Sequence, residues 1–323
     1  MAMPRSRATA LVVSVVYVVS VVGLLAGCGR GTGDHPASPS PSPSPSPSPP
    51  SSVASSPAAA TDRAAAAGLA AIEHRHHARL GVYAMDTGTG QTVSYRPDER
   101  FAHCSVFKAL EGGVLFRRES DAGLAHLLHY SAADMEEYSP ITRQHMGTGM
   151  TERQLVAAAM DYSDNTAANV LLHRLGGPHG LQSALRALGD RTTHNDRPEP
   201  GVNEAEPGDV RDTSTPRALA TDLRRFALGS VLRPDRREEY TALLKKNTTG
   251  GPFIRAGVPQ GWTVGDKTGN GWYGTRNDIA VLWPPKGAPI VLAVLSDRGR
   301  KDARSDDTLI ADATRAVVEG LRP

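Results

Sequence analysis

Segments with the composition typical of β-strands occur only near the two ends of the foldable part of this chain. Residues 82–95, "VYAMDTGTGQTVSY", read as two short strands around a glycine-rich turn. After residue 261 come three more such segments, "WTVGDKTG", "NDIAVLWPP" and "PIVLAVLSD". Strands from both ends must therefore share one sheet, and their hairpin-like links predict five antiparallel strands.

The sequence between these strand segments has helical periodicity. Six segments from residue 105 to residue 246 carry apolar residues at three- and four-residue spacing. A further helix precedes the first strand, with Thr61 or Asp62 as its expected N-cap and Gly81 as its expected end. Another, "TLIADATRAVVEGL", closes the chain. The predicted fold class is α/β plus all-α: a sheet flanked by the terminal helices, with a helical subdomain inserted.

The domain limits follow from this order. The α/β part is expected at about residues 61–97 and 247–323, and the helical part at about 98–246, within one folded domain of residues 61–323. Residues 29–60 form a Ser/Pro-rich stretch that has too little apolar surface to fold. At roughly 3 Å per residue in the polyproline II conformation, some 25 such residues would span about 75 Å. We therefore predict a disordered spacer before the folded domain.

Residues 1–28 read as an export signal. Two arginines precede a long apolar stretch, which ends in Leu25-Ala26-Gly27-Cys28. These four residues resemble a bacterial lipobox, which predicts that Cys28 is lipidated and becomes the new N-terminus. An uncleaved membrane anchor and plain secretion are the alternatives. In all three cases the folded domain lies outside the cytoplasmic membrane. The predicted contact with the membrane is the lipid on Cys28 alone.

The net charge and the cysteine content argue against a nucleic-acid-binding protein and against a disulfide-stabilised fold. The formal net charge is only +2, with acids and bases interspersed, so no basic surface for nucleic acid is predicted. The chain has two cysteines, Cys28 and Cys104. If Cys28 is lipidated, Cys104 has no partner, and a disulfide framework is excluded.

Three short motifs carry the predicted chemistry. Ser105 and Lys108 form S-x-x-K, in which a lysine one helical turn away can reach a serine hydroxyl. Alone, this spacing is as well explained by a helix cap and a solvated lysine. Ser163-Asp164-Asn165 and Lys267-Thr268-Gly269 follow in order, with Arg276 on the next strand. Only six lysines exist in the chain, and two of them fall in these motifs, so together they are a strong signal.

With these motifs the chain resembles the class A serine β-lactamases, within the penicillin-recognising serine enzymes, over the whole folded region. Tyr138 in "EYSPIT" matches an aromatic residue beside the substrate cleft. In "DRPEPGVNEAEPGDVRDT", Glu199 and Asn203 match the pair that holds the hydrolytic water. Arg197 and Asp212 match the ion pair that closes this loop.

The resemblance implies a role for each matched residue. Ser105 would be the nucleophile, and its backbone N–H would form the oxyanion hole with that of Asn270. Lys108 and Ser163 would pass a proton to the lactam nitrogen, and either Lys108 or Glu199 would be the acylation base. The remaining matched residues would bind substrate: Lys267, Thr268 and Arg276 at its carboxylate, Asn165 at its acylamide, and Gly269 elsewhere in the substrate site. A monomer without a cofactor is expected.

The sequence departs from the family pattern at a few positions. Pro198 and Gly201 replace a common aromatic and a common acid in the loop, which should alter its stiffness. Cys104 matches a position that one carbapenem-hydrolysing subgroup bridges to a second cysteine. The partner position here is Gly271, so that disulfide cannot form.

Other classes of function fit less well. His74, His76 and His77 loosely echo the start of a zinc site, but no second cluster of ligands follows, and solvated histidines are expected. A D,D-peptidase or penicillin-binding protein would share the serine and lysine motifs, and a β-lactam-trapping lipoprotein or sensor would stay acylated. Neither requires Glu199 and Asn203.

Overall fold

The computed structural model describes residues 57–322. The predicted signal peptide at 1–28, with Cys28, and most of the predicted spacer at 29–60 lie outside the described residues. Within 57–322, no helix is long and apolar enough to cross a membrane.

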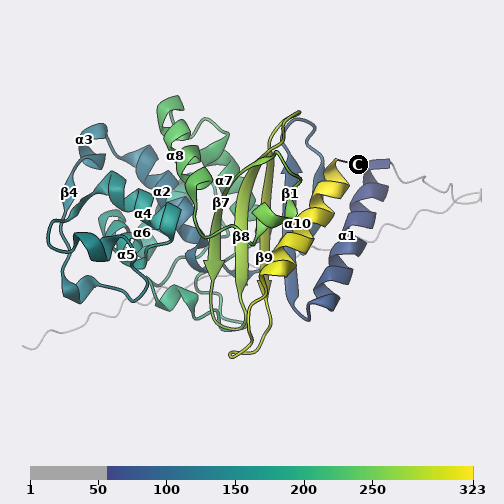
Figure 1. Cartoon of the computed structure of the whole chain (residues 1–323), viewed down its shortest axis with the longest axis horizontal. Coiled ribbons are helices and arrows are strands. Elements are labelled where there is room, and N and C mark those ends of the chain that lie inside the picture. Colours follow the sequence, from purple (N-terminus) through teal and green to yellow (C-terminus); the bar gives the residue numbers. More distant parts are fainter. Residues whose placement is uncertain (1–56, 323) are drawn as a thin grey trace, which may run out of the picture. The chain divides into compact units, whose positions relative to one another are not determined.

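The described chain runs from a helix through two strands, a long helical part and three strands to a final helix, as Figure 1 shows. The α-helices are α1 (Pro57–Arg75), α2 (Phe107–Arg118), α3 (Asp121–Leu124), α4 (Glu152–Tyr162), α5 (Asn165–Leu175), α6 (Pro178–Ala187), α7 (Pro216–Ala227), α8 (Pro234–Lys246), α9 (Ile254–Gly257) and α10 (Asp307–Leu321). The strands are β1 (Arg79–Asp86), β2 (Thr92–Tyr95), β3 (Phe101–Ala102), β4 (Leu127–Leu128), β5 (Met150–Thr151), β6 (Thr213–Ser214), β7 (Thr263–Asn270), β8 (Arg276–Trp283) and β9 (Ile290–Asp297). Short 3-10 helices are η1 (Cys104–Val106), η2 (Ala132–Asp134), η3 (Thr142–His145) and η4 (Gly201–Asn203).

Strands from both ends of the folded region form one sheet. Its order is β2-β1-β9-β8-β7, and every neighbouring pair is antiparallel. The central pairing joins β1 to β9, with Val82 opposite Val294. The predicted five-stranded antiparallel sheet is therefore confirmed. β7, which carries the Lys-Thr-Gly motif, is an edge strand beside the helical part (Figure 1).

Alternation along the strands divides the interior into two hydrophobic cores. On β9, Val291, Ala293 and Leu295 belong to the core shared with the helical part, including α2 and α7. The intervening residues Ile290, Leu292 and Val294 belong to the core beneath α1 and α10. Successive side chains of a strand point to opposite faces, so a sheet covered on both faces needs apolar residues at every position. The prediction that the terminal helices flank the sheet is confirmed (Figure 1).

The first helix differs from its predicted limits. It begins at Pro57 rather than near Thr61, and it ends at Arg75, before Gly81. His77 has a φ of 47°, and the chain then enters β1. Gly81 lies within that strand, where a Cβ would collide with the ring of Phe101. This glycine therefore serves close packing of β1 against β3 and not a helix end.

Helix α2 is buried on all sides from Phe107 to Phe116. Gly113 allows this, because a Cβ there would lie 2.6 Å from Cγ of Phe226 on α7. A helix enclosed in this way cannot shift without disturbing its neighbours, since protein interiors are close-packed. The segment that follows Ser105 is thus held rigidly in the middle of the helical part.

Two buried acids, Asp190 after α6 and Asp222 on α7, are neighbours in the fold. Oδ1 of Asp190 accepts the backbone N–H of Thr192 at 2.7 Å, and Oδ1 of Asp222 accepts from Arg225 at 2.7 Å. Both Oδ2 atoms are buried and find no donor among the groups of residues 57–322. Burial, with the charge of Asp190, raises the pKa of Asp222 to about 8. A proton on Asp222 shared with Asp190 satisfies both atoms.

We expect Asp222→Asn to remove a pH dependence of stability. In the wild type, folding raises the pKa of Asp222, so its contribution is full below about pH 4 and is lost as the pH rises toward about 8. Asparagine supplies the same donor without titrating. Between about pH 5 and pH 8, the wild type should therefore lose on the order of 2 kcal/mol more of its free energy of unfolding than the variant does. Urea unfolding at both pH values measures this, and an unchanged difference would disprove the shared proton.

Candidate active site

Ser105 stands at the start of the buried helical segment, in η1, directly after Cys104, which has a φ of 49°. Its side chain is buried, and Oγ donates to Oε1 of Glu199 at 2.7 Å. Glu199 lies 94 positions further along the chain, so this contact depends on the loop before η4 folding back against η1. A carboxylate that accepts the hydroxyl hydrogen of a serine can take its proton.

Lys108 lies one turn after Ser105, with its side chain fully buried. Its Nζ is 2.8 Å from Oε1 of Glu199, donates to the backbone oxygen of Ser163 at 2.8 Å, and donates to Oδ1 of Asn165 at 2.6 Å. Oγ of Ser163 is 3.4 Å away. The residues of S-x-x-K and S-D-N that the sequence singled out are thus brought together around one ammonium group.

Both the backbone and the side chain of Glu199 are hydrogen-bonded to neighbouring residues. Its backbone N–H and C=O bind the side chain of Asn169 on α5, each at 2.9 Å, and Nδ2 of Asn203 donates to Oε2. Burial would raise the pKa of Glu199, but Lys108 and the hydrogen bonds from Ser105 and Asn203 lower it below its usual range. Glu199 is therefore a carboxylate in the resting protein.

Asn169 was not predicted from the sequence. It lies one helical turn after Asn165, and residues four apart share a helix face. This four-residue spacing from Asn165 is the only sequence signal for Asn169, and it is weak because asparagine is common on helices.

Lys267 approaches the same cluster from β7. It is fully buried, and its Nζ donates to Oγ of Ser163 at 3.0 Å and to the backbone oxygen of Thr268 at 2.8 Å. Burial and the neighbouring charge of Lys108 lower the pKa of Lys267 to about 7. Ser163, whose own φ is 58° at the end of α4, therefore joins the two lysines through one hydroxyl.

A cavity of about 530 Å³ opens over these groups. Its lining includes the predicted catalytic residues Ser105 and Ser163. It also includes all the residues predicted to bind substrate except Lys267: Tyr138, Asn165, Asn203, Thr268, Gly269, Asn270 and Arg276. Tyr138 is half exposed at the rim. Sequence reasoning missed Thr249 and Asp307, which also line the cavity. The hydroxyl groups of Thr249 and Thr268 are 2.6 Å apart, so Thr249 extends the hydroxyl-lined wall.

Arg276 lies at the far wall of the cavity, on β8. Its Nε is 2.7 Å from Oδ1 of Asp307, the first residue of α10, and its guanidinium is 5.1 Å from the ring centroid of Phe253. Asp307 therefore orients this cation and offsets part of its charge.

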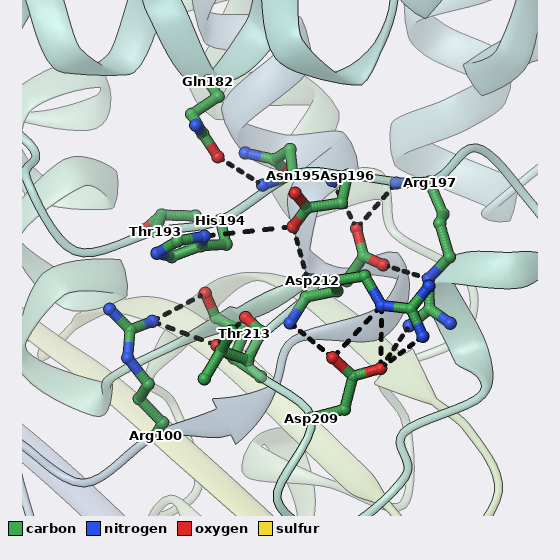
Figure 2. Close-up of polar contacts among 12 residues, drawn as sticks. Arg100, Gln182, Thr193, His194, Asn195, Asp196, Arg197, Asp209, Asp212 and Thr213 are labelled. Carbon is green, nitrogen blue, oxygen red and sulfur yellow. Dashed lines mark hydrogen bonds and ion pairs between the residues drawn. The ribbon is translucent and has the colours of Figure 1, made fainter.

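The loop that carries Glu199 is closed by charged groups at its neck, shown in Figure 2. Nε of Arg197 is 2.6 Å from Oδ2 of Asp212, and the backbone N–H groups of Asp196 and Arg197 both donate to Oδ1 of Asp212. Arg197 also pairs with Glu204. Since Asp212 is buried, this neck fixes both ends of the segment from 197 to 212.

Cys104 is a free, buried cysteine in the described chain. A Cβ placed on Gly271 would lie 2.7 Å from its sulfur, so the two positions are neighbours, as expected. Burial raises the pKa of the Cys104 thiol, which makes it a poor nucleophile.

The histidines near the end of α1 do not form a metal site. Residues 64–322 contain no group of three or more His, Cys, Asp or Glu side chains placed to hold a metal ion. The expectation that all three histidines are solvated is wrong for His76, whose side chain is only 9% exposed. Its two ring nitrogens contact Asp306 and Asp312, because α1 packs beside α10.

A buried serine, two lysines and a carboxylate at the junction of an antiparallel sheet and a helical part are what is expected of a penicillin-recognising serine enzyme. The model of the β-lactamase enzyme family matches residues 64–321. With relatives of more than 40% identity across the folded domain, the chain belongs to the β-lactamase enzyme family, in its class A branch.

Three relatives illustrate the similarity. A β-lactamase of Bacillus licheniformis is 52% identical over 253 residues, which cover 78% of this chain and 82% of that protein. The β-lactamase FAR-1 of Nocardia farcinica is 48% identical over 305 residues, or 94% of each chain. The crystal structure of a class A β-lactamase from Clostridium kluyveri is 44% identical, with a TM-score of 0.79, and covers 80% of this chain and 98% of its own.

Proposed function

We propose that this protein hydrolyses the amide bond of β-lactam antibiotics through an acyl-enzyme on Ser105, and so confers resistance to them. The single observation that carries the proposal is the contact from Oγ of Ser105 to Oε1 of Glu199 at 2.7 Å. This contact supports Glu199 as the base and Ser105 as the nucleophile.

In acylation, Oγ of Ser105 attacks the lactam carbonyl carbon while its proton leaves for a base. Nζ of Lys108 already faces three acceptor oxygens, on Glu199, on the backbone of Ser163 and on Asn165, so its N–H groups are directed at these and not at Ser105. This supports Glu199 over Lys108 as the acylation base. The C–O bond to Ser105 forms, the lactam C–N bond breaks, and the nitrogen receives a proton through Ser163, which both lysines contact.

Substrate recognition rests on the cationic and hydroxyl groups along β7 and β8. Lys267, Thr268 and Arg276 would bind the carboxylate that β-lactam antibiotics carry, and charge-assisted hydrogen bonds of this kind favour anionic substrates. The backbone N–H groups of Ser105 and Asn270 would stabilise the oxyanion. Asn165 would bind the acylamide, beside the exposed ring of Tyr138.

Deacylation distinguishes a hydrolase from a penicillin-binding protein or a β-lactam trap. Glu199 and Asn203 contact each other under Ser105, and both can hydrogen-bond a water molecule that attacks the ester carbonyl. Asn169, which binds the backbone of Glu199, keeps that carboxylate in place. This arrangement favours hydrolysis over either alternative.

The proposal also includes the setting of the enzyme. We infer an exported monomer that is anchored through lipid on Cys28 and held away from the membrane by the Ser/Pro-rich segment. Loss of metabolic palmitate labelling in Cys28→Ser, with retained β-lactamase activity, would support this; a wild-type protein that takes up no label would refute the anchor.

Hydrolysis by the purified protein tests the main proposal. Benzylpenicillin, a cephalosporin and a carbapenem should be examined by ultraviolet absorbance, and at least benzylpenicillin should be consumed with many turnovers per enzyme. Ser105→Ala is the control, which should leave no turnover. A wild-type protein that binds one penicillin covalently and then stops would be a penicillin-binding protein or a trap.

A further inference from the structure

The histidine at the end of α1 bridges two elements of the chain. His76 Nδ1 is 2.9 Å from Oδ2 of Asp306, and its Nε2 is 3.0 Å from Oδ2 of Asp312. Carboxylate oxygens only accept hydrogen bonds, so in each of these contacts the ring nitrogen is the donor. His76 thus joins the end of the first helix to the beginning of the last one.

Asp306 is the N-cap of α10. Its Oδ1 accepts from the backbone N–H of Thr308 at 3.0 Å and from the hydroxyl of Thr308 at 2.6 Å. Its Oδ2 accepts from His76 and, at 3.2 Å, from Arg298. Burial would raise the pKa of Asp306, but the hydrogen bonds from Thr308 and His76 lower it to about 2. Both oxygens are occupied, so the backbone at the start of α10 is fixed in position and direction.

The next residue, Asp307, belongs to the cavity described above. Its Oδ1 is 2.7 Å from Nε of Arg276, and both residues line the cavity. Consecutive Cα atoms are about 3.8 Å apart, so anything that fixes Asp306 also fixes the origin of the Asp307 side chain. The contact of His76 with Asp306 lies outside the cavity, but Asp306 is bonded directly to Asp307, whose carboxylate orients Arg276.

We propose that His76 is a positioning residue for substrate recognition: it fixes Asp306, and through the adjacent Asp307 it sets the orientation of Arg276 in the cavity. This inference rests on the proposed function, since it assigns Arg276 to the substrate carboxylate. That carboxylate is present in the ground state and in the transition state alike, so weaker binding of it raises KM and leaves kcat nearly unchanged.

The expected effect is specific. His76→Ala, and the milder His76→Gln, should raise KM for benzylpenicillin about three- to tenfold, with kcat within about twofold of the wild type. Asp312→Asn is the matched control: it removes one of the two carboxylates at His76 but leaves the contact with Asp306. It should lower the melting temperature without the rise in KM. Equal rises in KM for the control and the His76 variants would overturn the proposal.

A double-mutant cycle separates positioning from general destabilisation. In an Arg276→Ala background, His76→Ala has no cation left to position, so it should add no further rise in KM while still lowering the melting temperature. A rise in KM of the same factor in both backgrounds, or a fall in kcat at unchanged KM, would contradict the inference.

A failure of the His76 inference can be distinguished from a failure of the proposed function. If the wild type is acylated by a fluorescent penicillin but does not turn over, the hydrolase proposal fails. The same variants are then compared by the penicillin concentration that gives half the maximal acylation rate. That concentration should rise about three- to tenfold for the His76 variants and stay unchanged for Asp312→Asn; no rise for the His76 variants would refute the positioning role.

Discussion

Replacing Glu199 with alanine should convert the protein from an enzyme that turns penicillin over into one that stays acylated. The variant keeps Ser105, the two lysines and the backbone N–H groups, but it loses the base that contacts both Ser105 and Asn203. General-base assistance is worth roughly 10²–10⁴ in rate. Acylation is expected to slow, yet deacylation depends wholly on an activated water and should slow more, so the covalent ester accumulates.

Intact-protein mass spectrometry measures this result. After mixing with benzylpenicillin, Glu199→Ala should carry the mass of one added penicilloyl group, while the wild type shows it only fleetingly and consumes the substrate. Glu206→Ala is the matched control, because Glu206 lies on the same loop with its side chain exposed. It should behave as the wild type does. A Glu199→Ala protein with wild-type turnover would show that another group is the base.

Lys108→Ala should strongly reduce activity and also destabilise the fold. The pair of Lys108 Nζ and Glu199 Oε1 is 2.8 Å apart, with both side chains fully buried. Removing one member of a buried ion pair leaves an uncompensated charge and typically costs about 3–5 kcal/mol of stability. Without Lys108, burial raises the pKa of Glu199, so the base that accepts the Ser105 proton is neutralised. We expect kcat/KM to fall roughly 10²–10⁴-fold.

The double variant Lys108→Ala/Glu199→Ala isolates the cause. Removing the Glu199 side chain, which has lost its partner, should restore part of the lost stability, by on the order of 1–3 kcal/mol, while activity stays low. Urea unfolding of the two single variants, the double variant and the wild type gives the coupling energy. Strictly additive losses of stability would show that Lys108 and Glu199 do not depend on each other, against the geometry of the site.

The sequence alone was sufficient for much of the architecture. The β9 segment is apolar at six consecutive positions, residues 290–295, because both faces of the sheet are covered, and such a run is recognisable without coordinates. The order of the motifs around Ser105, Ser163 and Lys267 was equally readable, because each motif is a short local pattern. The end of α1 could not be read from the sequence. Gly81 resembles a helix stop, but it is needed within β1 because a Cβ there would collide with the ring of Phe101.

Residues that act on the site from a distance carry no such local pattern. Asn169 holds the backbone of Glu199, Asp307 orients Arg276, and His76 fixes the start of α10, yet each stands in an ordinary stretch of helix or helix end. The histidine was even expected to be solvated. It is paired because α1 and α10, at opposite ends of the described chain, pack side by side.

The sequence by itself therefore determined the periodic elements, the antiparallel sheet and the residue types of the site, because hydrophobic period and short motifs depend on near neighbours along the chain. Only the tertiary structure decided which of those residues touch. Ser105 and Glu199 are 94 positions apart, and His76 and Asp306 are 230 apart. Such contacts arise from the packing of whole elements against two shared cores, and that packing is a property of the complete fold rather than of any segment.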